Sequence, residues 1–123
     1  MQNIFKDVLN LSPEELIDWL FRNIPNEIPE EISDRADMQK ASKSLLKLSG
    51  YYSYMTTLQS YAKIMTREAK RNLPKEKHED MIDKKEIINN YTEAIKQSYQ
   101  AVSRAVTIYI ENNNEIRMGK EVP

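Results

Sequence analysis

The stretch MIDKKEIINNYTEAIKQSYQAVSRAVTIYIENNNEI, residues 81–116, decides the fold of this 123-residue chain. Its apolar side chains recur every seven residues, in a series that runs Met81, Ile88, Ile95, Val102, Tyr109, Ile116. A strict seven-residue repeat predicts an α-helix that packs against another helix in the manner of a coiled coil. We expect this helix over residues 79–117, with Gly119 as its C-terminal cap.

A second long helix is expected over residues 34–72, which contain no Pro and one Gly. Apolar residues recur there in steps of three and four, the helical spacing: Met38, Ala41, Leu45, Leu48, Tyr52, Met55, Leu58, Ala62, Met65 and Ala69. Gly50 lies inside this span, where a glycine is unfavourable. It is predicted to mark a bend or a close contact.

A short connection joins these two helices of nearly equal length, so we expect them to pack as an antiparallel hairpin. A reversal about residues 75–76 would bring Tyr51 near Gln100. It would also bring Leu45 near Val106. The apolar face of each helix is wider than a two-helix seam requires, which favours a homodimer that completes a four-helix bundle.

The N-terminal segment has a clear helix start at Ser12-Pro13-Glu14-Glu15. Ser12 can cap the helix, Pro13 suits the first helical position, and Glu15 can complete a capping box. The helix predicted over residues 13–23 is too short to be stable alone, so it should dock on the hairpin, near its open end. A shorter helix is expected over residues 3–9.

The predicted fold is therefore all-α, with a long, coiled-coil-like antiparallel hairpin and a short helical segment packed on it. Residues 1–33 form the N-terminal segment and residues 34–123 form the hairpin. The bundle is expected to be completed by dimerisation.

Composition excludes several classes of protein. The chain has no Cys, which rules out disulfides and thiolate metal sites, and a single His, His78, which we expect in an exposed loop. We find no Gly-rich phosphate loop, no Ser-His-Asp arrangement and no metal-ligand spacing. The sequence therefore predicts a protein that is not an enzyme, with no cofactor, no metal and no small-molecule substrate. Neither a signal peptide nor a membrane span is predicted, so the expected location is the cytoplasm.

Charge is distributed unevenly along a chain whose net charge is −1. Residues 1–37 carry nine acids and three bases, a net charge of −6, whereas residues 38–72 carry seven bases and one acid, a net charge of +6. A basic helix can bind phosphates or an acidic protein. It can equally be a solvated surface on which the acidic segment of the same molecule packs. The candidate binding residues for nucleic acid or an acidic partner are Lys63, Arg67, Lys70, Arg71, Lys75, Lys77, Lys84 and Lys85.

All seven Tyr residues fall in the hairpin. Stacking on single-stranded bases is one use for them, but packing in a core or an interface is the favoured use. Tyr54 and Tyr61 share a helix face and are expected to be exposed or at an interface. The candidate residues for a partner interface are Trp19, Leu20, Tyr54, Tyr61, Ile95, Tyr99, Val102 and Tyr109.

Three stretches carry a resemblance to a known group of proteins: LSGYYSYMTTLQSYAKIMTREAKR (48–71), KHEDMIDKKEIINNY (77–91) and QSYQAVSRAVTIYIENNNEIRM (97–118). The chain from Leu45 to Met118 resembles small helical proteins encoded in the early regions of bacteriophages and prophages of low-GC Gram-positive bacteria. Genes of this type neighbour recombination and single-strand-binding functions. The resemblance implies an accessory role in DNA metabolism and supplies no catalytic residues, and it does not cover the segment that contains Trp19.

Three functional hypotheses follow. The first is a phage-encoded, non-catalytic adaptor of DNA replication or recombination that acts through protein contacts and, in its direct form, through nucleic acid. The second is an inhibitor of a host defence system of the anti-CRISPR type. The third is a structural scaffold that only oligomerises. The sequence leaves open the partner, direct contact with DNA or RNA, and the oligomeric state.

Overall fold

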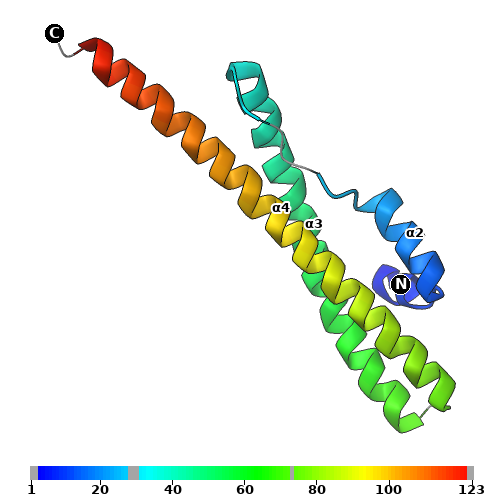
Figure 1. The fold of residues 1–123 in the computed structure, drawn as a ribbon. Coiled ribbons are helices and arrows are strands. Elements are labelled where there is room, and N and C mark those ends of the chain that lie inside the picture. Colours follow the sequence, from blue (N-terminus) through cyan, green and yellow to red (C-terminus); the bar gives the residue numbers. More distant parts are fainter. Residues whose placement is uncertain (1–2, 28–30, 73, 122–123) are drawn as a thin grey trace.

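The structure is a computed structural model that describes residues 3–27, 31–72 and 74–121, with side chains as far as residue 114. It contains four helices: α1 (Ile4–Leu9), α2 (Pro13–Asn23), α3 (Arg35–Asn72) and α4 (Lys75–Glu121). The described residues contain no strand, and the predicted all-α class is confirmed. α3 and α4 run antiparallel as a long hairpin, and α1 and α2 lie against one side of it (Figure 1).

The seam between α3 and α4 is built from two seven-residue series, as the repeat predicts. On α3 the fully or almost fully buried members are Leu48, Met55, Ala62 and Ala69, and on α4 they are Met81, Ile88, Ile95 and Val102. Each buried Leu, Ile, Met or Val side chain contributes about 1.5–3 kcal/mol when it leaves water, and an Ala side chain contributes less, so the seam is a large source of stability. Beyond Val102 the α4 series weakens, because Tyr109 is only half-buried. The side chain of Ile116 lies outside the described residues.

The boundaries of α4 differ from the prediction at both ends. The helix begins at Lys75, directly after Pro74, whose carbonyl oxygen accepts hydrogen bonds from the Lys77 and His78 amides. His78 is therefore helical and half-buried, and the prediction of an exposed loop histidine is wrong. Gly119 lies inside the last turns of α4, which continues to Glu121, so it does not cap the helix. A glycine ends a helix by adopting positive φ, and no glycine described by the structure does so.

Gly50 has no steric role in α3. A Cβ built on Gly50 would meet no heavy atom within 4 Å, so the predicted close contact is wrong. The helix continues without interruption through this position, because its hydrogen bonds and its neighbouring buried residues do not depend on a side chain there.

Both N-terminal helices have a capping side chain, and the cap that the sequence predicts at Ser12 is confirmed. The Ser12 hydroxyl accepts a hydrogen bond from the Glu15 amide at 3.2 Å, and the Asn3 side chain caps α1 in the same way. The other half of the capping box, in which the Ser12 amide would donate to the Glu15 carboxylate, is not among the hydrogen bonds of the described residues.

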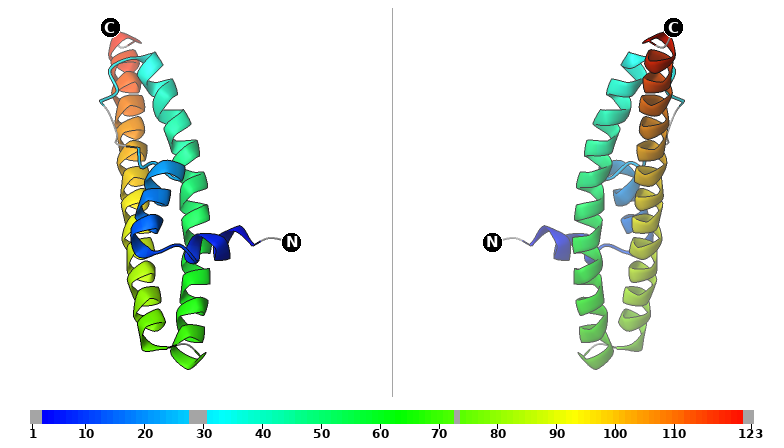
Figure 2. Two further views of the ribbon diagram at one scale, coloured as in Figure 1. Left: turned by 90° about the vertical axis from the view of Figure 1, so that its right-hand side faces the viewer. Right: turned by 90° about the vertical axis from the view of Figure 1, so that its left-hand side faces the viewer.

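α1 and α2 dock on the middle of the hairpin and not near its open end (Figures 1 and 2). The Lys84 ammonium donates to the Leu9 carbonyl oxygen at 2.7 Å, and the Tyr91 hydroxyl donates to the Ile24 carbonyl oxygen. The predicted docking position is wrong, because the side chains that receive the segment lie in the middle of α3 and in the tip half of α4.

The open end of the hairpin therefore has no cover from α1 or α2. α3 and α4 diverge toward this end (Figure 1). Leu46 is 77% exposed there, and Ile108 and Ile110 are exposed as well. The sequence predicts more apolar surface than two helices can bury, and part of this surface lies at the open end.

Candidate functional site

The groove between α3 and α4 has two sides, and only one of them receives the N-terminal helices. Tyr54 and Tyr61 each precede a buried residue of the α3 seam by one position, and both contact Phe5 of α1. Thr56 and Lys63 each follow a buried residue by one position. Since one residue turns an α-helix by about 100°, these pairs lie on opposite sides of the seam. We call the side with α1 and α2 the covered face and the other the back face, which is nearest the viewer at the right of Figure 2.

The back face contains a shallow hollow whose floor is tied across the two helices. The Gln59 side chain donates a hydrogen bond to the Asn89 side-chain oxygen at 3.0 Å. The hollow has a volume of about 480 Å³ and is lined by Thr56, Gln59, Ser60, Lys63, Lys85 and Asn89. These side chains are neutral donors or acceptors and two bases, with no acid among them, so the lining of the hollow suits an anion.

The basic residues continue from this hollow toward the tip of the hairpin. Lys70 follows Lys63 by seven residues and lies on the same stripe of α3, and Arg67 and Arg71 are exposed beside it. None of these four residues, nor Lys85, has an ion-pair partner within 4.0 Å in the described part of the chain. We call Lys63, Arg67, Lys70, Arg71 and Lys85 the basic strip.

The remaining three predicted basic residues do not belong to the basic strip. Lys84 is 5% exposed, and its ammonium group bonds to Leu9 and, at 3.1 Å, to Asp80. It is a core residue, so its prediction as a ligand-binding residue is wrong. Lys77 is exposed but lines a pocket of the covered face. Lys75 is exposed at the tip and lies 4.0 Å from Glu79.

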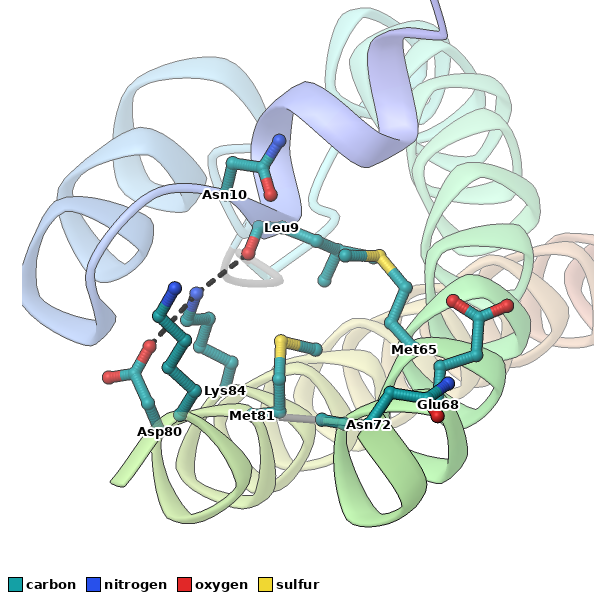
Figure 3. Close-up of a pocket in the computed structure, with 10 residues that line it drawn as sticks. Leu9, Asn10, Met65, Glu68, Asn72, Asp80, Met81 and Lys84 are labelled. Atoms are coloured by element: carbon teal, nitrogen blue, oxygen red, sulfur yellow. Dashed lines mark hydrogen bonds and ion pairs between the residues drawn. The ribbon is translucent and has the colours of Figure 1, made fainter. Parts of the chain in front are cut away.

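That pocket of the covered face lies between the end of α1 and the tip half of the hairpin (Figure 3). It has a volume of about 470 Å³ and a floor that includes Leu9, Met65 and Met81. Two acids and two bases line it: Glu68, Asp80, Lys77 and Lys84. The two acids and two bases balance in charge, and the Lys84 ammonium is already bonded to Leu9 and Asp80. We therefore interpret the pocket as a structural contact between α1 and the hairpin and not as a ligand site. Sequence reasoning missed it, because Leu9 and Lys84 are 75 residues apart.

The predicted partner interface separates into core residues and surface residues. Leu20, Ile95 and Val102 are at most 3% exposed, so they are unavailable to a partner and this part of the prediction is wrong. A seven-residue spacing marks a buried stripe, and it does not show whether the same molecule covers that stripe. Tyr99 is 39% exposed and Tyr109 is half-buried, so both remain at the surface.

The other three predicted interface residues form an aromatic cluster inside the molecule. Tyr54 lies 4.9 Å from Phe5 and 5.9 Å from Trp19, measured between ring centroids. Tyr61 stacks on Phe5 at 5.1 Å. The sequence predicts Tyr54 and Tyr61 to be exposed or at an interface. They lie at an interface within the molecule, partly buried, because α1 and α2 supply the aromatic rings that cover them.

Burial changes the chemistry of two tyrosine hydroxyls. The Tyr54 hydroxyl is buried and has no hydrogen-bond partner among the described residues, and this burial raises its pKa. Burial also raises the pKa of Tyr91, whose hydroxyl donates to the backbone after α2. Neither hydroxyl faces a base that would activate it, so both are structural groups.

No cluster of three or more His, Cys, Asp and Glu residues that could hold a metal ion occurs in the part of the chain that the structure describes. No helix there is both long and apolar enough to cross a bilayer.

The fold and the site together define a class: an all-α hairpin protein with a docked N-terminal helix pair and, on its back face, a hollow lined by Lys63 and Lys85. Comparison of the chain with protein-family models, with curated proteins and with solved structures gives no match. The surfaces of the molecule are therefore the basis for its proposed function.

Proposed function

We propose that this chain is a non-catalytic binding protein whose back face contacts the phosphate backbone of nucleic acid. The hollow that holds Lys63 and Lys85 carries this proposal, because it combines two bases with neutral hydrogen-bonding side chains and no acid. Phosphate oxygens accept hydrogen bonds from such a set of groups. The role fits the accessory function in phage DNA replication or recombination that the sequence resemblance implies.

The charges of the basic strip are available to a ligand. Its five members carry no ion pair within the described residues, so binding a polyanion breaks no internal contact. The single acid of residues 38–72, Glu68, lies on the covered face, where it lines the pocket beside α1. Each lysine or arginine that neutralises a phosphate releases counterions and strengthens binding at low salt.

Fluorescence anisotropy with a labelled oligonucleotide tests this proposal. At about 50 mM salt the affinity of the double variant Lys63→Gln/Lys85→Gln should fall about tenfold, and its salt slope should decrease by about two. The matched control is Lys40→Gln/Lys43→Gln, which removes the same charge from exposed positions near the start of α3. Absence of binding at low salt, or an equal loss in both variants, would refute the proposal.

The second candidate function, inhibition of a host defence system, is favoured by the outer face of α2. Phe21 is 63% exposed and Ile17 is 39% exposed there, and the acids Glu14 and Asp18 are exposed on the same helix. An apolar patch with an acidic rim suits a basic nuclease surface. If this function holds, the chain expressed in a host should restore plating of a targeted phage. Phe21→Ala should abolish that effect while the protein stays folded.

A further inference from the structure

The back face does not end at the hollow, because each of its stripes continues toward the open end. Tyr52 precedes Gln59 by seven residues and extends its stripe on α3. On α4, Lys96 follows Asn89 by seven residues, and Tyr99 follows Lys85 by fourteen. In a packed helical hairpin, residues at multiples of seven share a side. The hollow therefore leads into a region with one base and two tyrosines.

The Gln59–Asn89 hydrogen bond sets the relative height of these residues. At 1.5 Å per residue, Tyr52 lies about 10 Å and Tyr99 about 15 Å beyond that bond toward the open end. Lys63 and Lys85 both lie about 6 Å on the other side, toward the tip. The two tyrosines thus lie at similar positions along the hairpin axis, one on each helix. Lys63 and Lys85 lie opposite each other, closer to the tip.

Tyr52 and Tyr99 differ from the tyrosines that pack inside the molecule. They are 36% and 39% exposed, and neither belongs to the hydrophobic core. The four tyrosines that pack against the core are Tyr51, Tyr54, Tyr61 and Tyr91. Each helix thus holds one partly exposed ring, Tyr52 on α3 and Tyr99 on α4, on the same side as Lys96 and the hollow. Proteins that stack unpaired bases beside a phosphate-binding groove use such an arrangement.

An acidic stripe borders this path on one side. Glu79, Glu86 and Glu93 are spaced by seven residues and are exposed on the outer side of α4, one position beyond the residues that face the hollow. A duplex is wider than the groove and would bring its second phosphate backbone against these carboxylates. A single strand can lie between them and the basic strip, so the charge pattern favours a single strand.

We propose that the path from Lys70 through the hollow to Tyr52 and Tyr99 binds single-stranded nucleic acid, with bases stacked on the two tyrosines and phosphates on the lysines. This inference rests on the proposed function and narrows it from nucleic acid in general to single strands. The path is about 30 Å long by helical rise. It accommodates roughly five extended nucleotides, which is within the site sizes of proteins that bind by stacking.

The test compares labelled dT12, U12 and a 12-base-pair DNA duplex by fluorescence anisotropy. The variant is Tyr52→Leu/Tyr99→Leu, which keeps apolar bulk on the helices and removes the aromatic faces. We expect its affinity for the single strands to fall about tenfold or more, and its affinity for the duplex to change less than twofold. A loss confined to dT12 or to U12 identifies that strand as the ligand. Tyr109→Leu, which lies outside the path, should bind as the unmodified protein does.

The outcomes separate this inference from the proposed function. Equal binding of single strands and duplex, with no effect of the leucine variant, overturns the inference and leaves the phosphate-binding back face in place. No binding of any probe at low salt overturns both. A change in molar mass of the leucine variant by light scattering, without a change in binding, shows that a second copy of the chain uses the tyrosines and overturns the inference. Circular dichroism of each variant confirms that it is folded.

Discussion

Two tyrosine hydroxyls in similar surroundings have opposite energetic roles. The Tyr54 hydroxyl is buried without a partner among the described residues, whereas the Tyr91 hydroxyl donates to the Ile24 carbonyl oxygen. An unpaired buried hydroxyl costs about 1–3 kcal/mol relative to its hydration, and a satisfied one stabilises by about 1 kcal/mol. The aromatic rings pack in both cases, so the difference lies in one atom.

We therefore expect Tyr54→Phe to raise the free energy of unfolding by about 1 kcal/mol and Tyr91→Phe to lower it by about 1 kcal/mol. Urea denaturation followed by circular dichroism measures both changes, and each substitution is the control for the other. A destabilised Tyr54→Phe protein would show that its hydroxyl has a partner in solution.

The raised pKa values of the same two tyrosines give the fold a pH dependence. In each case burial favours the neutral phenol, so the folded-state pKa lies above the unfolded value of about 10. The contribution of each neutral phenol to the free energy of unfolding is present in full below pH 10, and it is lost as the pH rises through the folded-state pKa. Thermal unfolding between pH 9 and pH 11.5 should show a decline in melting temperature that is smaller in Tyr54→Phe.

Gly50 offers a stabilising substitution. It is exposed in the middle of α3 and an added Cβ would meet nothing within 4 Å. Alanine should raise the free energy of unfolding by about 1 kcal/mol, because glycine loses more backbone entropy in a helix. Urea denaturation measures the change. A loss of stability would reveal a contact at Gly50 that exists only in an oligomer.

At the scale of elements, Lys84 holds α1 to α4. Its ammonium group is the hydrogen-bond donor to the Leu9 carbonyl oxygen at the end of α1, and it pairs with Asp80 on its own helix. Leu9 lines the pocket of the covered face, and Lys84 is the side chain that donates to its carbonyl oxygen. The attachment of the short α1 to the hairpin therefore combines this polar contact of Lys84 with the packing of Phe5 and the burial of Val8 and Leu9.

Lys84→Ala should lower the free energy of unfolding by about 2 kcal/mol, because a buried carbonyl oxygen loses its donor and the stem of the lysine leaves a void. Amide hydrogen exchange should rise in α1 and α2 and stay slow in the α3–α4 seam. Lys85→Ala, at the neighbouring position on the back face, is the control and should change stability by no more than about 0.5 kcal/mol. Equal effects of the two substitutions would contradict this role of Lys84.

At the scale of the whole molecule, the exposed apolar side chains at the open end of the hairpin favour a dimer, which we propose. Leu46 and Ile108 are exposed on the parts of α3 and α4 that are nearest this end, whereas α1 and α2 lie against the middle of the hairpin (Figure 1). A second copy of the chain would bury such surface, at about 25 cal/mol per Å² of apolar area. Light scattering at micromolar concentration should then give twice the monomer mass. Ile108→Glu should give a monomer, whereas Ile64→Glu, an exposed position nearer the tip, should not.

The sequence predicts those parts of the fold that depend on local spacing. The seven-residue series through Ile88 and Ile95 identifies both the α4 helix and its buried stripe, and Ser12 identifies the start of α2. The docking of the N-terminal helices could not be predicted, because it depends on contacts between residues 67 to 75 positions apart. Such contacts decide that Lys84 is a core residue and that Tyr54 is covered.

The candidate site was predicted in part for the same reason. Helical spacing groups Lys63, Arg67, Lys70 and Arg71 on α3 without knowledge of the partner helix. Lys85 joins them only through the register between α3 and α4, which the Gln59–Asn89 hydrogen bond reports. Charge alone did not separate Lys84 from Lys85, although one is buried and the other lines the back-face hollow.

The long sequence separation between Leu9 and Lys84 has a consequence for synthesis on the ribosome. α1 and α2 emerge first, but their binding surface includes α4 residues as far along the chain as Tyr91. At a translation rate of about 5–20 residues per second, the apolar side chains of Leu16, Leu20 and Phe21 have no α4 to pack against for several seconds after synthesis. The nascent chain is thus open during this interval to chaperones, proteases or a neighbouring copy of itself, before the N-terminal helices can dock.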